Sequence, residues 1–452
     1  MKPQRCLRSI VLLVGLITAG ASAGTITWTG SGATGSWHTA GNWDLNRVPG
    51  AGDDVLIPDV AGTASVTFSS GSTSIRSLTC SEAFVLSGGT LSIDEVSTMN
   101  SGCAFSGGTS SGTGTLTLKG TSTWSGGTMT GAGSTVVAAG ASLSITNSVY
   151  LYRDLTNDGT MTWTGGNIYG GGGTTLTNNG QLTAEFSSSL QWQSNDGNHT
   201  LTNAGTFTKR GTGQALFAHY SSYFQSFNNN GTVSVEAGTL YLQCNGTSAS
   251  GTFDVAESTT LYLSGTHALA NTTLEGASPL TVYSGTATFT GTLGGTGRMA
   301  IAGGTANFED EAQKELAGGL AFTSGALGGT GTLTLKGTST WSGGTMTGAG
   351  SIVVAAGASL SITNSVYLYR NLTNDGTMTW TGGNIYGGGG TTLTNNGQLT
   401  AEFSSSLQWQ SNDGNHTLTN AGTFTKRGTG QALFAHYSSY FQSFNNNGTV
   451  SV

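Results

Sequence analysis

Residues 155–161 read LTNDGTM, the first of four related motifs within residues 112–235. The others read LTNNGQL at 176–182, LTNAGTF at 201–207 and FNNNGTV at 227–233, so the motif returns at short and nearly regular intervals. Apolar residues alternate with polar ones around each N-x-G turn, which indicates short strands with one buried face. One unit of this size cannot bury that face alone, so successive units are expected to stack.

The repeat length favours a parallel β-helix. A second motif, aromatic-[ST]-G-G-x-x-x-G-x-G, begins at Trp124 and Trp163, with a looser version at Phe105, so one unit is about 19–26 residues long. A coil of that size holds two or three short strands. Asparagine at a fixed place before glycine can form a ladder of side-chain amides along the stack. The expected fold is an all-β, right-handed parallel β-helix, its hand taken from the general crossover preference.

The competing architecture is a string of antiparallel β-sandwiches, which also show short strands with frequent turns. Such domains should repeat at roughly 90–100 residues, the size of one sandwich, and be separated by proline-containing linkers. This chain has only 4 prolines in 452 residues, which suits interior strands that donate hydrogen bonds to both neighbours. Its charged fraction of 8% argues against a helical protein and against a charged disordered one.

A long duplication contains the short repeats. Residues 112–235 and 329–452 are near-identical copies, joined by the different segment 236–328. The two differences are Thr135 against Ile352 and Asp154 against Asn371. After the first copy the chain continues as a further strand, whereas the second copy stops at Val452. We therefore expect that the chain is a fragment of a longer array, or that its C-terminal coil frays and self-associates.

The N-terminus, residues 1–23, is predicted to be a cleaved signal peptide. Basic residues precede an apolar stretch at 10–17, and Ala21-Ser22-Ala23 supplies a cleavage site. The stretch is too short to span a bilayer, so a secreted or cell-surface protein is expected, with no transmembrane segment in the mature chain. Removal of three basic residues leaves 12 basic and 22 acidic residues, from 15 and 22. This balance argues against a nucleic-acid partner, because such partners require clustered lysine and arginine.

Residues 24–60 differ from the repeat region, 61–452. They contain Trp28, Trp37 and Trp43 and two of the four prolines. A β-helix needs a cap over its first coil, and large aromatic rings can cover an apolar end. We interpret this segment as an N-terminal cap, with a sugar-binding aromatic platform as the alternative.

The tryptophan-rich N-terminal module followed by G-G-x-x-x-G-x-G and L-x-N-x-G-x repeats resembles large secreted bacterial β-helix proteins. These include autotransporter passengers and filamentous-haemagglutinin-like adhesins. The resemblance covers most of the mature chain, and its motifs are structural and of low specificity. It implies a secreted or cell-surface β-helix that is often adhesive.

Catalytic, metal and cofactor signals are sparse, and none is assigned. Asp53-Asp54 lies in the cap segment, where a role in a turn is favoured over catalysis. The only dense charge cluster, 309–315, lies in the one stretch, 308–317, that could form a short helix. It is interpreted as a protruding loop or helix, with calcium binding or acid/base chemistry as alternatives. Its spacing does not match a known calcium loop, and the histidines lack metal-ligand spacing.

Aromatic residues give the better functional signal. Trp192 lies between two glutamines and recurs as Trp409, and the segment 218–227 is unusually aromatic and recurs at 435–444. Rings beside amides can stack on sugars and bond hydroxyls, although the same rings could fill the coil interior. The candidate glycan-contacting residues are Trp192, Tyr220, Tyr223, Trp409, Tyr437 and Tyr440.

Two functions follow from these patterns. The favoured one is a secreted or cell-surface structural or adhesive rod, with extracellular glycans or cell-surface components as partners and without catalysis, because an adhesive surface gains avidity from copies. The alternative is a carbohydrate-active β-helix enzyme, a polysaccharide lyase or glycoside hydrolase, which needs clustered carboxylates. Cys80 and Cys103 are separated by about one coil, so a disulfide between stacked coils is an alternative to free thiols.

Overall fold

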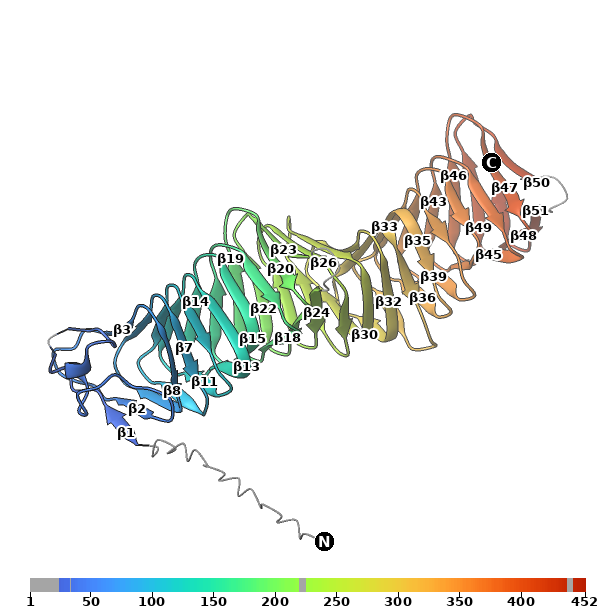
Figure 1. Ribbon diagram of the computed structural model, residues 1–452. Coiled ribbons are helices and arrows are strands. Elements are labelled where there is room, and N and C mark those ends of the chain that lie inside the picture. The colour runs from blue at the N-terminus through green and yellow to red at the C-terminus, as the bar shows by residue number, and fades with distance from the viewer. Residues whose placement is uncertain (1–23, 33, 219–224, 437–441) are drawn as a thin grey trace, which may run out of the picture.

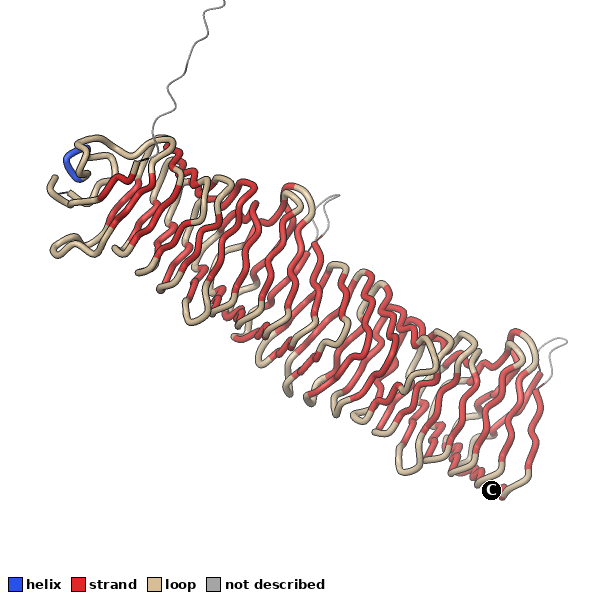
Figure 2. The backbone as a smooth tube through the Cα atoms, turned by 90° about the horizontal axis from the view of Figure 1, so that it is seen from below, coloured by secondary structure: helices blue, strands red, loops and turns tan. Residues whose placement is uncertain are grey.

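The computed structural model describes residues 24–32, 34–218, 225–436 and 442–452. The described residues form 52 strands and one short 3-10 helix, η1 (Ala40–Asn42), wound into a rod of about 18 turns (Figure 1). Strands in successive turns pair in parallel, and these pairings form three ladders, so each turn has three sides. Figure 2 shows the turns stacked along the rod. The prediction of an all-β parallel β-helix is confirmed, and its right hand stays a prediction.

The first side, face A, begins beyond the cap and runs to the last coil. Strands in this ladder follow one another at intervals of one coil, and Tyr150, for example, pairs with Tyr169 of the next coil. Its strands are β4 (Ser72–Ile75), β7 (Thr90–Ile93), β10 (Thr109–Ser111), β13 (Thr128–Val137), β15 (Val149–Asn157), β17 (Ile168–Gly171), β20 (Leu190–Asp196), β23 (Gln214–Ala218), β26 (Thr239–Gln243), β29 (Thr260–Ser264), β31 (Pro279–Val282), β33 (Arg298–Phe308), β35 (Leu320–Gly328), β37 (Thr338–Trp341), β40 (Ser359–Ile362), β43 (Thr377–Trp380), β46 (Gln398–Glu402), β49 (Thr423–Arg427) and β52 (Thr449–Ser451).

The second side, face B, begins with the first strands of the described chain. The long strands β13, β15, β33 and β35 turn the corner from face A and contribute their second halves here. Its other strands are β1 (Thr25–Thr27), β2 (Asp54–Ile57), β5 (Ser77–Cys80), β8 (Ser97–Met99), β11 (Thr115–Leu118), β18 (Thr174–Asn178), β21 (His199–Asn203), β24 (Gln225–Asn229), β27 (Gly246–Ser248), β30 (Thr266–Glu275), β32 (Thr286–Gly294), β38 (Thr345–Met346), β41 (Val366–Leu368), β44 (Ile385–Gly388), β47 (Leu407–Asp413) and β50 (Ala432–His436).

The third side, face C, closes the coil. It includes the second halves of β30 and β32, which continue past the corner from face B. Its other strands are β3 (Val66–Phe68), β6 (Phe84–Leu86), β9 (Cys103–Phe105), β12 (Thr121–Trp124), β14 (Ser142–Ile145), β16 (Thr160–Trp163), β19 (Gln181–Glu185), β22 (Thr206–Arg210), β25 (Thr232–Val235), β28 (Thr252–Val255), β34 (Lys314–Leu316), β36 (Thr332–Leu335), β39 (Ser351–Val354), β42 (Asn371–Asn374), β45 (Thr391–Asn395), β48 (His416–Asn420) and β51 (Gln442–Asn446).

The coil interior is a continuous core built by alternation along each strand. Leu155, Leu176, Leu201 and Phe227, the first residues of the four sequence motifs, lie in register on successive coils of face B and are buried. Each buries its side chain against the ring or aliphatic group of the coil before it, so the apolar face that one unit cannot cover is covered by stacking.

The asparagines of the same motifs form the expected amide ladder inside the stack. Asn157 donates from Nδ2 to Oδ1 of Asn178 at 2.7 Å, Asn178 donates likewise to Asn203 at 2.7 Å, and Asn203 to Asn229 at 2.8 Å. All four side chains are buried. The ladder satisfies polar groups that would otherwise be costly at the turn of every coil.

The tryptophans of the N-terminal segment pack together at the start of the rod. Trp43 contacts Trp28 and Trp37 edge to face, with ring centroids 5.0 and 4.9 Å apart, and all three are buried. Trp37 reaches Phe68 and Phe84, the first rings of face C, at 5.7 and 6.0 Å. This cluster covers the apolar end of the stack, as a cap would, while β1 and β2 of the same segment already pair within face B.

The structure decides two alternatives that the sequence left open. The described cysteines, Cys80, Cys103 and Cys244, are free thiols. The local coil is shorter than the stretch between Cys80 and Cys103, so Cys80 lies on face B, whereas Cys103, which pairs with Phe84, lies on face C. The stretch 308–317 is not helical. Asp310 lies in a turn with φ of 61°, and 314–316 form strand β34, whose buried first residue is Lys314.

Candidate functional site

The structure overturns the assignment of Trp192 and Trp409 as glycan contacts. Both side chains have 0% exposure, because they occupy the inward positions of β20 and β47. Trp192 stacks on Phe217 of the next coil with ring centroids 5.5 Å apart. The other four candidates, Tyr220, Tyr223, Tyr437 and Tyr440, lie outside the described residues.

Aromatic residues are instead divided by type between the inside and the outside of the rod. All nine tryptophans are buried in the core. Every tyrosine among the described residues lies outward, in one of three clusters. A tyrosine has an apolar ring and a hydroxyl, so a row of outward rings offers both a stacking surface and hydrogen-bonding groups.

The first tyrosine cluster consists of Tyr150, Tyr152 and Tyr169 on face A. The rings of Tyr150 and Tyr169 stack on adjacent coils with centroids 5.0 Å apart and an interplanar angle of 22°, and Tyr150 remains 39% exposed. Amides hold the hydroxyls: Asn167 donates to Tyr169 and Asn195 to Tyr152, both at 3.3 Å. The cluster is therefore an exposed ring surface whose orientation is fixed by its neighbours.

The second tyrosine cluster consists of Tyr241, Tyr262 and Tyr283, also on face A. Tyr262 lies over Tyr241 with centroids 5.6 Å apart, and Tyr283 lies over Tyr262 at 4.9 Å. Tyr283 is the most exposed of the three at 46%. The hydroxyl of Tyr241 shares a hydrogen bond of 3.2 Å with the hydroxyl of Ser264, which continues to Ser284. The three neighbouring rings thus lie beside a chain of hydrogen-bonded hydroxyls.

The third tyrosine cluster, Tyr367, Tyr369 and Tyr386, is the duplicate of the first. Its stacked pair has the same centroid distance, 5.0 Å, at 24°, and Tyr367 is 39% exposed. Asn384 donates to the hydroxyl of Tyr386 at 3.1 Å. The duplication therefore provides two copies of one local surface.

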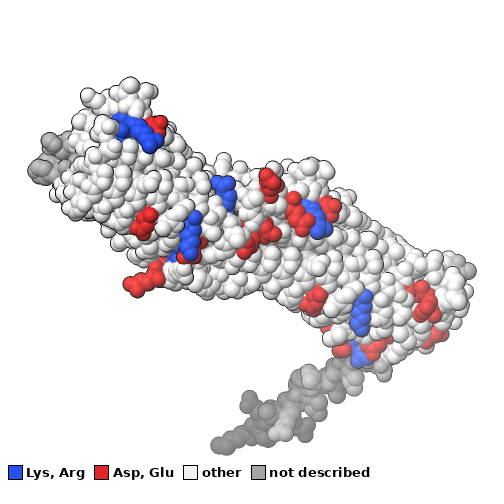
Figure 3. All heavy atoms as spheres, turned by 180° about the vertical axis from the view of Figure 1, so that it is seen from behind, with Lys and Arg blue, Asp and Glu red and all other residues white. Residues whose placement is uncertain are grey.

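Charge is sparse around the clusters. On the side of the rod shown in Figure 3, acidic and basic side chains form small separate groups with wide uncharged areas between them. Beside the first cluster, the outward neighbours on β20 are Gln191 and Gln193, whose amides flank the buried Trp192. Asp154 and Asp196 lie toward the corner with face B. The chemistry of the surface is that of rings, amides and hydroxyls.

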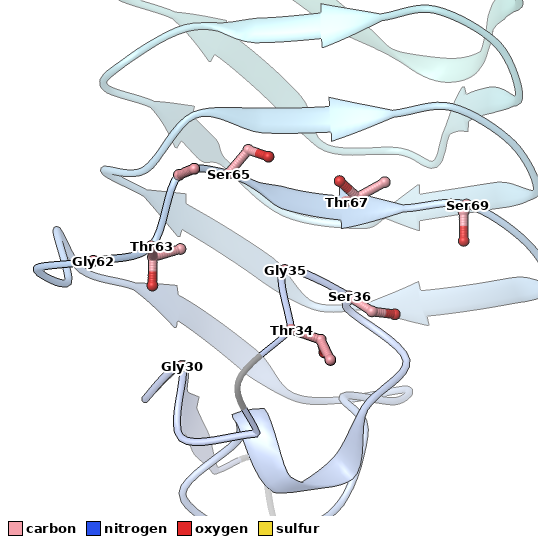
Figure 4. Close-up of a pocket in the computed structure, with 10 residues that line it drawn as sticks. Gly30, Thr34, Gly35, Ser36, Gly62, Thr63, Ser65, Thr67 and Ser69 are labelled. Atoms are coloured by element: carbon pink, nitrogen blue, oxygen red, sulfur yellow. The ribbon is translucent and has the colours of Figure 1, made fainter.

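A groove at the N-terminal end is chemically simpler. It has a volume of about 590 Å³ and lies between the cap loop at 30–36 and the chain at 62–69 (Figure 4). Its lining consists of glycine, alanine, serine and threonine, with hydroxyls from Thr34, Ser36 and Thr67 among them. No titratable side chain lines it, so this groove has no group for acid or base catalysis.

The acidic clusters noted in the sequence are engaged in structural contacts. Arg47 holds Asp53 at 2.6 Å, and this contact keeps the pKa of the Asp53 carboxyl below its usual value. Arg76 pairs with Asp54. In the turn after β33, Lys314 pairs with Asp310 at 2.5 Å.

Among the described residues, no group of three or more His, Cys, Asp or Glu side chains is placed to hold a metal ion.

Buried cations are also satisfied by the fold. Arg153, 2% exposed, donates to the carbonyl oxygens of Gly114 and Ser134 at 2.7 and 3.0 Å, and burial lowers its pKa. Lys209 has no exposed surface and donates to the carbonyls of Arg210 and Gly211. Burial lowers its pKa to about 8. These groups close coil corners and are out of reach of a polymeric substrate.

Sequence reasoning missed all three tyrosine clusters, although the signal for the second was present. Tyr241 and Tyr262 are separated by one coil, and each lies between two buried leucines of an alternating strand. A residue between two inward positions must point outward. Applied to Trp192, the same rule places the ring inward and its glutamine neighbours outward.

In the part of the chain that the structure describes, no helix is long and apolar enough to cross a membrane. Comparison with known proteins found no matching protein-family model, no matching curated protein and no matching solved structure.

Proposed function

We propose that this chain is a secreted or cell-surface rod that adheres to neutral glycans through its outward tyrosine clusters, without catalysis. The observation that carries the proposal is the division of aromatic residues: tryptophan fills the core, and all the described tyrosines lie outward in clusters of neighbouring rings. The interior does not need these rings. Tyrosine supplies rigid, amphipathic contact area at low entropic cost, which suits recognition surfaces.

The amides and hydroxyls around the rings support a sugar ligand over a protein or an ionic polymer. Asn167, Asn195 and Ser264 bond the tyrosine hydroxyls, so a bound sugar meets hydrogen-bonding groups in fixed positions beside each ring. The scarcity of charge favours a neutral glycan, because an ionic polymer would require clustered opposite charge.

The test is binding of residues 24–452 to a glycan array, followed by affinity electrophoresis in gels containing neutral polysaccharides. The variant Y150A/Y169A/Y241A/Y262A/Y367A/Y386A should lose binding. The control V96A, which changes a side chain 75% exposed outside the clusters, should retain it. Full binding by the cluster variant, with an unchanged melting temperature, would refute the proposal.

The same experiment tests the absence of catalysis. Released oligosaccharides, measured by reducing ends and by absorbance of unsaturated products, would support the alternative of a carbohydrate-active enzyme. The ion pairs of Asp53, Asp54 and Asp310 argue against that alternative, since a hydrolase needs two accessible carboxylates flanking its substrate.

A further inference from the structure

The first and second tyrosine clusters lie on the same face of the rod. Tyr150 pairs with Tyr169, and from β17 the face A ladder continues through β20, β23, β26 and β29 to β31. The strand of Tyr150, β15, and the strand directly before Tyr283, β31, are thus six stacking steps apart. At ~4.8 Å per step the two clusters span roughly 29 Å along the axis.

The gap between these clusters is lined by groups that can contact sugar. In register from Tyr169, the following coils present Gln193 and Gln243 outward, whereas Ala218 and Ser264 of the same row are buried. A parallel row leads from Gln191 through Leu216 to Tyr241. We call this continuous uncharged surface, from Tyr150 to Tyr283 on face A, the tyrosine strip.

The third cluster lies on a different face, although its sequence is that of the first. Ten stacking steps lead along face A from β17 to β43, through β20, β23, β26, β29, β31, β33, β35, β37 and β40. The copy of β17 is the next strand, β44, and it belongs to face B. The second copy therefore lies ten turns further along the rod than the first, and each of its strands lies on the next face.

In the described chain, the face B strands that precede the third cluster present no tyrosine in register with it. Toward the N-terminus, Tyr367 pairs with Thr345, which pairs with Ala326, which pairs with Thr305. Every other tyrosine that the structure describes belongs to the strip on face A. Of the three described clusters, only the first and second share a face, so the third is separated from them by a corner of the coil.

We propose that the tyrosine strip binds one extended, linear neutral glycan along the rod axis, across its first and second clusters, whereas the third cluster, which lies on another face, binds a separate chain. This inference rests on the proposed function. Two clusters on one face act on the same chain at high effective concentration, so their contributions are coupled. A cluster on a different face cannot join that chain without the chain bending around a corner of the coil.

The experiment compares chain lengths in backgrounds that retain one face. Y367A/Y386A retains the strip, and Y150A/Y169A/Y241A/Y262A retains the third cluster. The probes are gluco-, manno- and malto-oligosaccharides of two to eight units, hydroxyethylcellulose, galactomannan and amylose, with affinity measured by calorimetry. In the strip background, affinity should rise with chain length, and adding Y262A should lower polymer affinity at least tenfold. In the third-cluster background, affinity should level off at short chains.

Y169A and Y386A form a matched pair, because the two rings have the same stacking distance and an asparagine partner each. We expect Y169A to reduce binding of the polymer more than binding of a trimer, and Y386A to reduce both alike. The native protein should also crosslink the soluble polymer, seen as light scattering, whereas either one-face background should not. Melting curves show whether each variant is folded.

Equal length dependence in the two backgrounds, or equal effects of Y169A and Y386A on polymer and trimer, would overturn this inference while leaving the proposed function intact. Absence of binding to every probe, or binding that survives removal of all three clusters, would overturn both.

Discussion

The amide ladder inside the duplicated segments allows a graded test of what holds neighbouring coils together. Asn178 accepts from Asn157 at 2.7 Å and donates to Asn203 at 2.7 Å and to the carbonyl of Thr206 at 3.1 Å. Asn178→Ala removes these three bonds and a longer one, at 3.4 Å, to the carbonyl of Gly180. It leaves Oδ1 of Asn203 buried without its donor, whereas Asn157 still donates to the carbonyl of Gln181 at 2.9 Å.

The expected cost follows from these contacts. A buried polar atom left without a partner costs about 1–3 kcal/mol, and each further bond lost costs about 1 kcal/mol. Asn178→Ala should therefore lower the free energy of unfolding by about 2–4 kcal/mol. Asn157→Ala should cost less, because Oδ1 of Asn157 has no partner and the substitution removes that unsatisfied atom.

Urea denaturation followed by tryptophan fluorescence measures these costs, since the indoles lie in the core. Asn395, the duplicate of Asn178, makes the same contacts at 2.7 and 2.7 Å, so Asn395→Ala should match Asn178→Ala. The double variant should show the sum, because the two sites share no partner. The reasoning fails if Asn157→Ala costs as much as Asn178→Ala, or if Asn178→Ala costs less than about 0.5 kcal/mol.

Three further predictions concern acid, thiols and export. Burial lowers the pKa of His199 and of His416 to about 4 from the ordinary 6.5, so between these pH values the unfolded chain binds protons that the folded chain does not bind. The contribution of these histidines to stability should be complete above about pH 6.5 and fall as pH drops toward 4. The melting temperature of H199Q/H416Q should decline less steeply over that range. Thiol titration of residues 24–452 should find three reactive thiols in denaturant without reductant and almost none in the native protein, because burial raises the pKa of Cys80 and Cys244 to about 12; fewer than three would indicate a disulfide. The exported protein should begin at Gly24 by intact-mass measurement, and a retained Met1 would contradict the signal-peptide prediction.

The fold was predictable because every coil repeats the same physical problem. Alternation around Asn157 and Gly159 shows a strand, a turn and another strand, and the return of that pattern after about one coil shows stacking. The amide ladder follows as well, since the asparagines occur at one place in each motif. In contrast, alternation places Lys209 inward with Phe207, but the partners of its ammonium could not be predicted, because they are carbonyls of a corner whose shape no local pattern specifies.

Of the candidate site residues, the tryptophans were misplaced by sequence reasoning. Rings beside amides pointed to Trp192, but the alternation that makes Leu190 and Trp192 lie on one side of β20 directs the indole inward. The tyrosines occupy the outward positions of their strands, and only their spacing of one coil in the sequence shows that their rings lie side by side. The relation between the clusters needed the structure. Coils vary in length, and the variations add up along the chain, so the distance along the sequence does not reveal which face a strand reaches.

The near-identical copies show that one sequence forms the same coils when its first strand lies on a different face of the rod. The same segment starts on one side in the first copy and one third of a turn later in the second, with the same pairings throughout. Insertions and deletions in such a rod can therefore be counted in strands, without keeping whole turns. A gene duplication of arbitrary phase yields a working stack, and each such event changes the direction in which an existing patch points. Length variation in this protein would thus change the angle between its surface patches.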